Sequence, residues 1–275
     1  MIDKYTGFNT EALKALSLRD KAVLLGQFAR EFAQVAYNVF RQDENRTIPT
    51  IPFHVAKGNA KTGETKSISF LPIATCSEFA CKTCGKEKGA CYALKSLIYP
   101  NVCINLLHNT IWLYLIEIED SDYYAPAFPL ENYLRDYIES EIKGESIVRW
   151  HVAGDINSRV HLEFMSQIAY DLPTTTFYTY TKSYGILQGW LKDYGKLHSN
   201  LKILISDWCG ENIPAQYPEL ASKNKVAYVD DGKTDYIPKN AFRCKGNGQS
   251  KDSAHTCATC GYMCAKGINV VFPLH

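Results

Sequence analysis

The fold predicted for this chain follows from one stretch, Ser146-Ile147-Val148-Arg149-Trp150-His151-Val152-Ala153-Gly154-Asp155. Its first seven residues are rich in β-branched and aromatic side chains, which is typical of a buried strand, and the Ala-Gly-Asp triplet ends that strand. A helix is predicted directly afterwards over 158–170, and a second strand over 174–180. A strand, a helix and a strand in this order form the unit from which parallel sheets are built.

The same alternation extends outward on both sides of this stretch. Further strands are predicted at 67–72, 201–206, 225–229 and 268–272, and further helices at 92–117, 130–143, 184–197 and 214–222. Apolar residues spaced by three and four predict a helical extension over 10–42. We therefore expect an α/β fold of parallel strands alternating with helices, curled into a partial or distorted (β/α) barrel, with a cysteine-rich C-terminal segment.

Length and composition predict one domain. The chain has 275 residues, of which 46% are hydrophobic, and this is enough to fill a sizeable core. No linker or repeat divides it, so residues 1–275 are expected to form a helical extension (1–45), a core (46–240) and a metal-binding segment with the last strand (241–275).

The charge balance is close to neutral. The chain carries 30 basic and 29 acidic residues, so the net charge indicates no strong attraction to nucleic acid or a membrane, although a local basic patch would still allow nucleic acid to bind. The sequence shows neither a signal peptide nor an apolar run long enough to span a bilayer. A cytoplasmic protein without a membrane partner is the expectation.

Eight of the ten cysteines fall into two groups of four. The first group is Cys76, Cys81, Cys84 and Cys91, and the second is Cys244, Cys257, Cys260 and Cys264. Because disulfides are rare in the cytoplasm, these groups are interpreted as metal or cluster ligands. Cys103 and Cys209 lie in apolar segments and are expected to be small core residues.

The spacing of the thiols bears on which metal they bind. Tetrathiolate sites hold zinc or iron, and structural zinc usually uses two tight C-x2-C pairs. The first group has a single such pair, whereas the second continues as C-x2-C-x3-C, which is close to the pattern for cubane clusters. One or two iron–sulfur clusters of the [4Fe–4S] type are therefore preferred over zinc. Three ligands in a group would leave a reactive iron, and four would give a structural or electron-transfer centre.

Functional side chains are expected at the carboxyl ends of the strands, where parallel sheets collect their chemistry. His151 is interpreted as a proton carrier or a donor beside a cluster, with a core histidine as the alternative. Asp155 follows Gly154, which permits close backbone approach, and its carboxylate can bind an amine or a metal. Strand alternation places Arg149 on the face of His151, where it can hold an anionic substrate or form an ion pair with Asp155. These three are the candidate catalytic residues.

Several motifs in order resemble the phage-associated family called gene product 88. They are Gly58-Asn59-Ala60-Lys61-Thr62-Gly63, Thr75-Cys76, Cys91-Tyr92-Ala93, the stretch from Arg149 to Ile156, Tyr180-Thr181-Lys182-Ser183-Tyr184, Ser206-Asp207 and the cysteine-rich tail. The resemblance covers about 55–265 and implies a phage or prophage origin, hence the host cytoplasm, without naming a reaction. The first loop has one thiol more than the family pattern, either Cys81 or Cys84.

The chain is also similar, more distantly, to the fold of radical S-adenosylmethionine enzymes. Those enzymes place a cysteine loop after the first strand of a partial barrel, and a strand ending in Gly-Gly-Glu contacts the cofactor. The similarity implies that Ala153, Gly154 and Tyr92 contact a cofactor, with S-adenosylmethionine as the candidate. The first loop reads C-x4-C-x2-C, which departs from the C-x3-C-x2-C spacing of those enzymes.

Three functions remain open from the sequence. The first is a cluster-dependent redox or radical enzyme acting with an unidentified small-molecule substrate or electron donor. The second is a nucleic-acid-binding or regulatory protein with structural clusters, and the third is a zinc-stabilised scaffold without catalysis.

Overall fold

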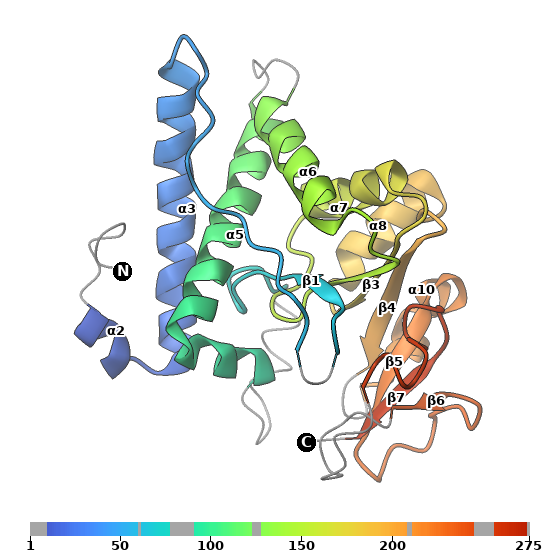
Figure 1. Cartoon of the computed structure of the whole chain (residues 1–275). Helices are drawn as coiled ribbons and strands as arrows, with labels where there is room; N and C mark the ends of the chain where they lie inside the picture. Colours follow the sequence, from blue (N-terminus) through green and yellow to red (C-terminus); the bar gives the residue numbers. More distant parts are fainter. Residues whose placement is uncertain are drawn as a thin grey trace.

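A seven-stranded, wholly parallel sheet forms the centre of the protein (Figure 1). This computed structural model describes residues 10–59, 62–77, 91–122, 128–207, 211–244 and 256–273. The strands lie in the order β1-β2-β3-β4-β5-β7-β6. They are β1 (Lys66–Ile68), β2 (Ile147–Trp150), β3 (Thr176–Thr181), β4 (Leu201–Asp207), β5 (Lys225–Asp230), β6 (Phe242–Arg243) and β7 (Val270–Pro273).

Helices connect strands β1 to β5, as the α/β expectation requires, and two further helices precede β1. They are α2 (Thr10–Ala15), α3 (Leu18–Gln42), η1 (Tyr92–Ile98), α5 (Pro100–Ser121), α6 (Pro129–Ile142), α7 (Arg159–Asp171), α8 (Tyr184–Tyr194), α9 (Ile213–Gln216) and α10 (Pro218–Lys223). The helix predicted over 10–42 is split at Ser17, whose hydroxyl caps α3 by accepting the N–H of Asp20 at 3.1 Å. No helix within the described ranges is long and apolar enough to cross a membrane.

The strand order explains how the sheet is covered. Strands β1 to β5 lie side by side in chain order, and crossovers between parallel strands are right-handed, so their helices gather on one face. Such a sequential arrangement is compatible with the curled, partly barrel-like sheet that the sequence predicts. Figure 1 shows α7 and α8 next to each other beside β3 and β4.

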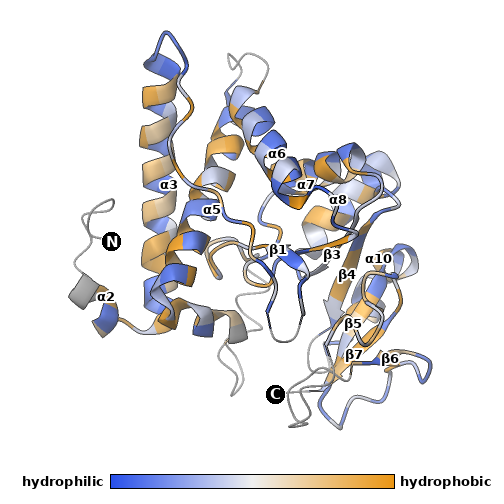
Figure 2. Cartoon of the chain, in the orientation of Figure 1, coloured by the Kyte–Doolittle hydropathy of each residue, from blue (hydrophilic) through white to orange (hydrophobic). Residues whose placement is uncertain are grey.

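The two faces of the sheet differ in what covers them. The helix-covered face carries the main core, including Val148, Trp150, Phe177 and Ile205. The opposite face, here called the inner face, carries a smaller apolar cluster of Leu204, Ala227 and Val270, packed with Tyr180, Phe242, Cys264, Ile268 and Phe272. Figure 2 shows apolar residues along β3, β4, β5 and β7. The C-terminal segment 256–267 therefore shields a second side of the sheet.

The N-terminal helices form a layer beside the sheet. Helix α3 lies along α5 (Figure 1), and its apolar stripe is buried there at Leu25, Ala29, Ala33 and Phe40. This confirms the N-terminal helical extension. Between α3 and the sheet, the chain makes antiparallel pairs at Ala56 with Ser67 and at Asn59 with Gly63, which is the hairpin turn that the glycines in this stretch favour.

Candidate functional site

Gly154 brings the segments after β1 and β2 together at the carboxyl edge of the sheet. Its φ is +83°, and a Cβ built there would lie 2.5 Å from Oγ1 of Thr75 and 3.2 Å from Cβ of Phe70. The backbone N–H of the next residue, Asp155, donates to the same Thr75 hydroxyl at 3.4 Å. The position therefore requires glycine both for its conformation and for the close approach of Thr75.

Asp155 is a buried carboxylate with a full set of local donors. It is 5% exposed and accepts hydrogen bonds from Thr181 Oγ1 at 2.6 Å, from the Ile156 N–H at 2.7 Å and from the Lys182 N–H at 2.9 Å. Burial raises its pKa to about 6, and these hydrogen bonds oppose the rise. The carboxylate ties the ends of β2 and β3 together. Its role toward an amine or a metal stays a prediction.

His151 lies on the helix-covered face, whereas Arg149 lies on the inner face. Arg149 pairs in register with Tyr178, and its guanidinium carbon lies 5.3 Å from the ring centre of Tyr180. His151 has a φ of +58°, and its Nδ1 lies 2.9 Å from Oγ1 of Thr179, whose side chain points away from those two tyrosines. The expectation that strand alternation puts Arg149 and His151 on one face is therefore wrong, because the left-handed backbone interrupts the alternation.

A buried hydrogen-bonded chain begins at His151 and reaches α5. Nε2 of His151 lies 3.4 Å from Nε2 of His161, and Nδ1 of His161 lies 2.8 Å from Oδ1 of Asn157. The amide nitrogen of Asn157 donates to Oε1 of Glu117 at 2.7 Å, and the Ser158 hydroxyl donates to the same oxygen at 2.5 Å. The sequence analysis missed His161, Asn157 and Glu117, although the i, i+4 spacing of Asn157 and His161 was a usable signal.

The hydrogen-bond partners determine which ring nitrogens of His151 and His161 carry protons. The amide of Asn157 points its nitrogen at a carboxylate, so its oxygen accepts from Nδ1–H of His161, whose Nε2 is then an acceptor. His151 donates through Nε2 and accepts at Nδ1 from the Thr179 hydroxyl. Burial lowers the pKa of His161 to about 3 and lowers the pKa of His151 well below its usual value. Both imidazoles are neutral at pH 7, which favours the core-histidine interpretation of His151.

Cysteines of the second group lie against the inner face of the sheet. The Tyr178 hydroxyl lies near the thiol of Cys257 and the Tyr180 hydroxyl lies near the thiol of Cys264, and each hydroxyl lowers the pKa of its neighbouring thiol. Burial raises the pKa of Cys264 to about 11, and the nearby Cys244 and Cys257 raise it further, whereas Tyr180 and Arg149 oppose the rise. Burial also raises the pKa of Cys257, with contributions from Cys260 and Cys244. Cys257 is thus within electrostatic range of the other three thiols.

Tight turns hold these thiols. Gly261 and Tyr262 both have positive φ, at +69° and +53°, and the Tyr262 N–H donates to the Cys257 carbonyl at 2.9 Å. The Cys260 thiol donates to the same carbonyl oxygen at 3.2 Å. The Cys244 N–H donates to the carbonyl of Val271 in β7 at 2.9 Å, which anchors the start of the segment to the sheet. As placed, no three His, Cys, Asp or Glu side chains within the described residues form a metal-binding group.

The first cysteine group is described only in part. Cys76 accepts a hydrogen bond at Sγ from the Ile73 N–H at 3.3 Å, and the neighbouring Ser77 hydroxyl lies 3.3 Å from the Lys182 carbonyl oxygen, at the end of β3. Cys91 directly precedes η1. Cys81, Cys84 and the side chain of Tyr92 lie outside the described residues, so the predictions made for them stay predictions.

The remaining two cysteines were predicted to be core residues. Cys103 is fully buried in α5, which confirms this. Cys209 lies outside the described residues.

Together the fold and the site define a parallel α/β protein whose inner sheet face is covered by a thiol-rich C-terminal segment. Residues 37–266 match the family model of gene product 88, and the chain belongs to this family. The resemblance found in the sequence is thereby confirmed. No curated protein and no solved structure matches the chain, so the similarity to radical S-adenosylmethionine enzymes has no support from these comparisons.

Proposed function

We propose that the chain binds an iron–sulfur cluster through Cys244, Cys257, Cys260 and Cys264 on the inner face of the sheet. The observation that supports this most is that Cys257 interacts electrostatically with the other three thiols, which come from two separate segments, and that Arg149 acts on Cys257 and Cys264. The thiols would draw together around the group by side-chain rotation, which the turn-rich backbone of 256–267 allows.

The surroundings suit a thiolate centre. Four thiolates around a [4Fe–4S] core carry a net negative charge, and burying that charge is costly without compensation. Arg149 lowers the pKa of Cys257 and of Cys264, so it favours their thiolate forms. The hydroxyls of Tyr178 and Tyr180 lie near two of the sulfurs. Hydrogen bonds from such hydroxyls would orient the ligands and tune the reduction potential of a cluster. In this proposal Arg149 balances the charge of the centre.

The test is anaerobic purification followed by an absorption spectrum and assays of iron, sulfide and zinc. A brown protein containing iron and sulfide supports the proposal, and the double variant Cys257→Ala/Cys264→Ala should lose most of both. Cys103→Ala is the matched control, because this thiol is buried in α5 and should leave the metal content unchanged. Stoichiometric zinc without sulfide would contradict the cluster and leave a zinc-stabilised scaffold.

A second measurement tests whether the proposed cluster takes part in catalysis. In this proposal the cluster supports redox or radical chemistry, with Asp155 and Gly154 at the carboxyl edge near the first cysteine loop. Electron paramagnetic resonance of the reduced protein, recorded with and without S-adenosylmethionine, distinguishes the possibilities. A spectral change on adding the cofactor supports a radical-type enzyme, whereas an unchanged spectrum indicates an electron-transfer or structural cluster.

A further inference from the structure

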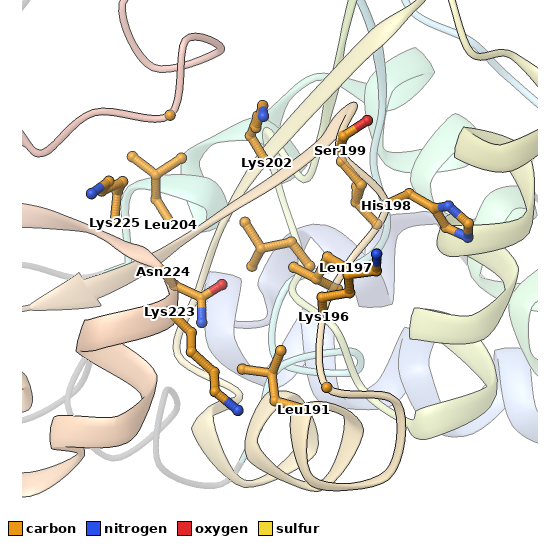
Figure 3. Close-up of a pocket in the computed structure, with 14 residues that line it drawn as sticks. Leu191, Lys196, Leu197, His198, Ser199, Lys202, Leu204, Lys223, Asn224 and Lys225 are labelled. Atoms are coloured by element: carbon orange, nitrogen blue, oxygen red, sulfur yellow. The ribbon is translucent and has the colours of Figure 1, made fainter.

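A cavity with a basic rim lies at the amino-terminal edge of β4 and β5, the edge opposite the carboxyl ends (Figure 3). Its volume is about 390 Å³, within the range of small-molecule sites. Four lysines line it: Lys196 between α8 and β4, Lys202 in β4, Lys223 at the end of α10, and Lys225 at the start of β5.

The positive charge of this rim is largely unbalanced. None of the 14 residues that line the cavity is acidic, and none of the ion pairs within the described part of the chain includes one of the four lysines. His198, Ser199 and Asn224 add further polar groups. A local concentration of cations on a chain of net charge +1 attracts an anion.

Helix ends account for only two of the lysines. Lys196 and Lys223 lie at the C-termini of α8 and α10, where a cation interacts favourably with the helix dipole. Glu219 lines a neighbouring hollow and lies four residues before Lys223, which is the spacing of ion pairs on a helix. Lys202 and Lys225 lie on strands, and the stem of Lys202 packs near Gly267. Neither a helix dipole nor an acidic residue lining the cavity accounts for the presence of Lys202 and Lys225 there.

Apolar residues also line the cavity. Leu191, Leu197, Ile203 and Leu204 line it between the lysines, and Figure 3 shows Leu197 in the middle of the cavity with the lysines around it. A partly apolar lining beside several cations suits a ligand that has an apolar or ring-containing body and several negative charges. We propose that this cavity, at the amino-terminal edge of β4 and β5, binds a phosphorylated small molecule of the nucleoside diphosphate class.

The test measures binding of four probes to the full chain by calorimetry: ADP, pyrophosphate, adenosine and a single-stranded oligonucleotide of about 12 nucleotides. ADP should bind more tightly than pyrophosphate or adenosine, because it contacts both the rim and the interior. The variant Lys202→Gln/Lys225→Gln should weaken ADP binding about tenfold, since it removes two partly exposed charge contacts. Affinity of the wild-type protein should also fall as salt is added.

Lys143→Gln is the matched control, because Lys143 is an exposed lysine at the C-cap of α6 that does not line the cavity. It should bind ADP as the wild type does, and unchanged circular dichroism of both variants shows that they fold. The proposal is overturned if ADP does not bind or if the double variant binds ADP as well as Lys143→Gln does. Binding of the oligonucleotide without ADP would also overturn it and assign the rim to nucleic acid.

Discussion

Two residues with positive φ shape the chain where β2 ends. His151 turns its ring toward Thr179 and α7, and Gly154 lets the backbone approach Thr75. At a residue other than glycine, such as His151, this conformation costs free energy and persists where surrounding contacts hold it. At His151 those contacts are the hydrogen bonds to Thr179 and His161.

Replacing Gly154 by alanine should lower the free energy of unfolding by about 3 kcal/mol or more, because alanine is strained in the left-handed conformation and its Cβ would clash with Thr75. Gly144→Ala is a control for the backbone contribution alone, because Gly144 has nearly the same φ, +82°, and no atom within 4 Å of its built Cβ. It should cost only about 1 kcal/mol. Urea denaturation measures both, and equal losses would show that the contact with Thr75 is unimportant.

Asp155 should make stability depend on pH. Because its pKa is raised from 3.8 to about 6 in the folded state, it contributes stability below pH 3.8 that is lost as the pH rises through 6. Relative to Asp155→Asn, the free energy of unfolding of the wild type should therefore be about 2 kcal/mol greater near pH 4 than at pH 7. Urea denaturation of both proteins across this range measures the difference. A difference that stays constant with pH would contradict the raised pKa.

For single residues, the sequence predicted where polar side chains lie along the chain better than it predicted the direction in which they point. The carboxyl end of β2 was predicted to carry polar side chains, and Asp155 is buried there with three donors. The face of His151 could not be predicted, because it depends on one backbone angle. Its partner His161 could not be predicted either, because the pair forms only when α7 packs on the sheet.

Among the elements, α6 has its first turn stabilised by another helix. Glu119 of α5 is fully buried, and its carboxylate accepts the N–H groups of Leu130 at 3.0 Å and Glu131 at 2.9 Å. The residue before α6, Phe128, is in the left-handed conformation and supplies no side-chain cap. A side chain distant in sequence thus takes the place of a local N-cap.

Glu119→Gln should lower the free energy of unfolding by about 2 kcal/mol. The amide keeps the shape of the carboxylate but turns an N–H₂ group toward one of the two backbone N–H donors, which then lacks an acceptor. Glu163→Gln on α7 is the control, because this side chain is exposed, and its effect should stay within about 0.5 kcal/mol. Thermal and urea denaturation measure both, and similar values for the two variants would refute the capping role.

Elements with a long periodic pattern were predicted well. Strands β2 to β5 and helix α6 lie within two residues of their predicted bounds, because apolar alternation and proline breaks mark them. Strand β1 ends at Ile68 instead of extending to residue 72, because its partner β2 ends at Trp150 and the left-handed backbone of His151 interrupts the regular pairing. Strand β6, with two residues, is too short to show any period and was missed.

In the molecule as a whole, removing the proposed metal centre should destabilise the C-terminal segment more than the layer formed by α3 and α5. Extracting the metal with a chelator should raise amide hydrogen exchange at Cys244, Tyr262 and Gly267, whose N–H groups bond within the C-terminal segment or to β7. The layer formed by α3 and α5 should keep its protection, because it packs away from that segment. Hydrogen exchange read by mass spectrometry resolves the two regions. A uniform rise across both would contradict the local coupling.

The position of β7 sets an order of events in time. Strands β1 to β5 can join the sheet one after another, whereas β7 must enter between β5 and β6, both of which precede it in the chain. The gap between those two strands stays open until this late insertion. Because Cys244 follows β6 and Cys264 precedes β7, their thiols approach each other only as the gap fills. Metal capture and completion of the sheet would then be a single step, and refolding should be faster in the presence of the metal than in its absence.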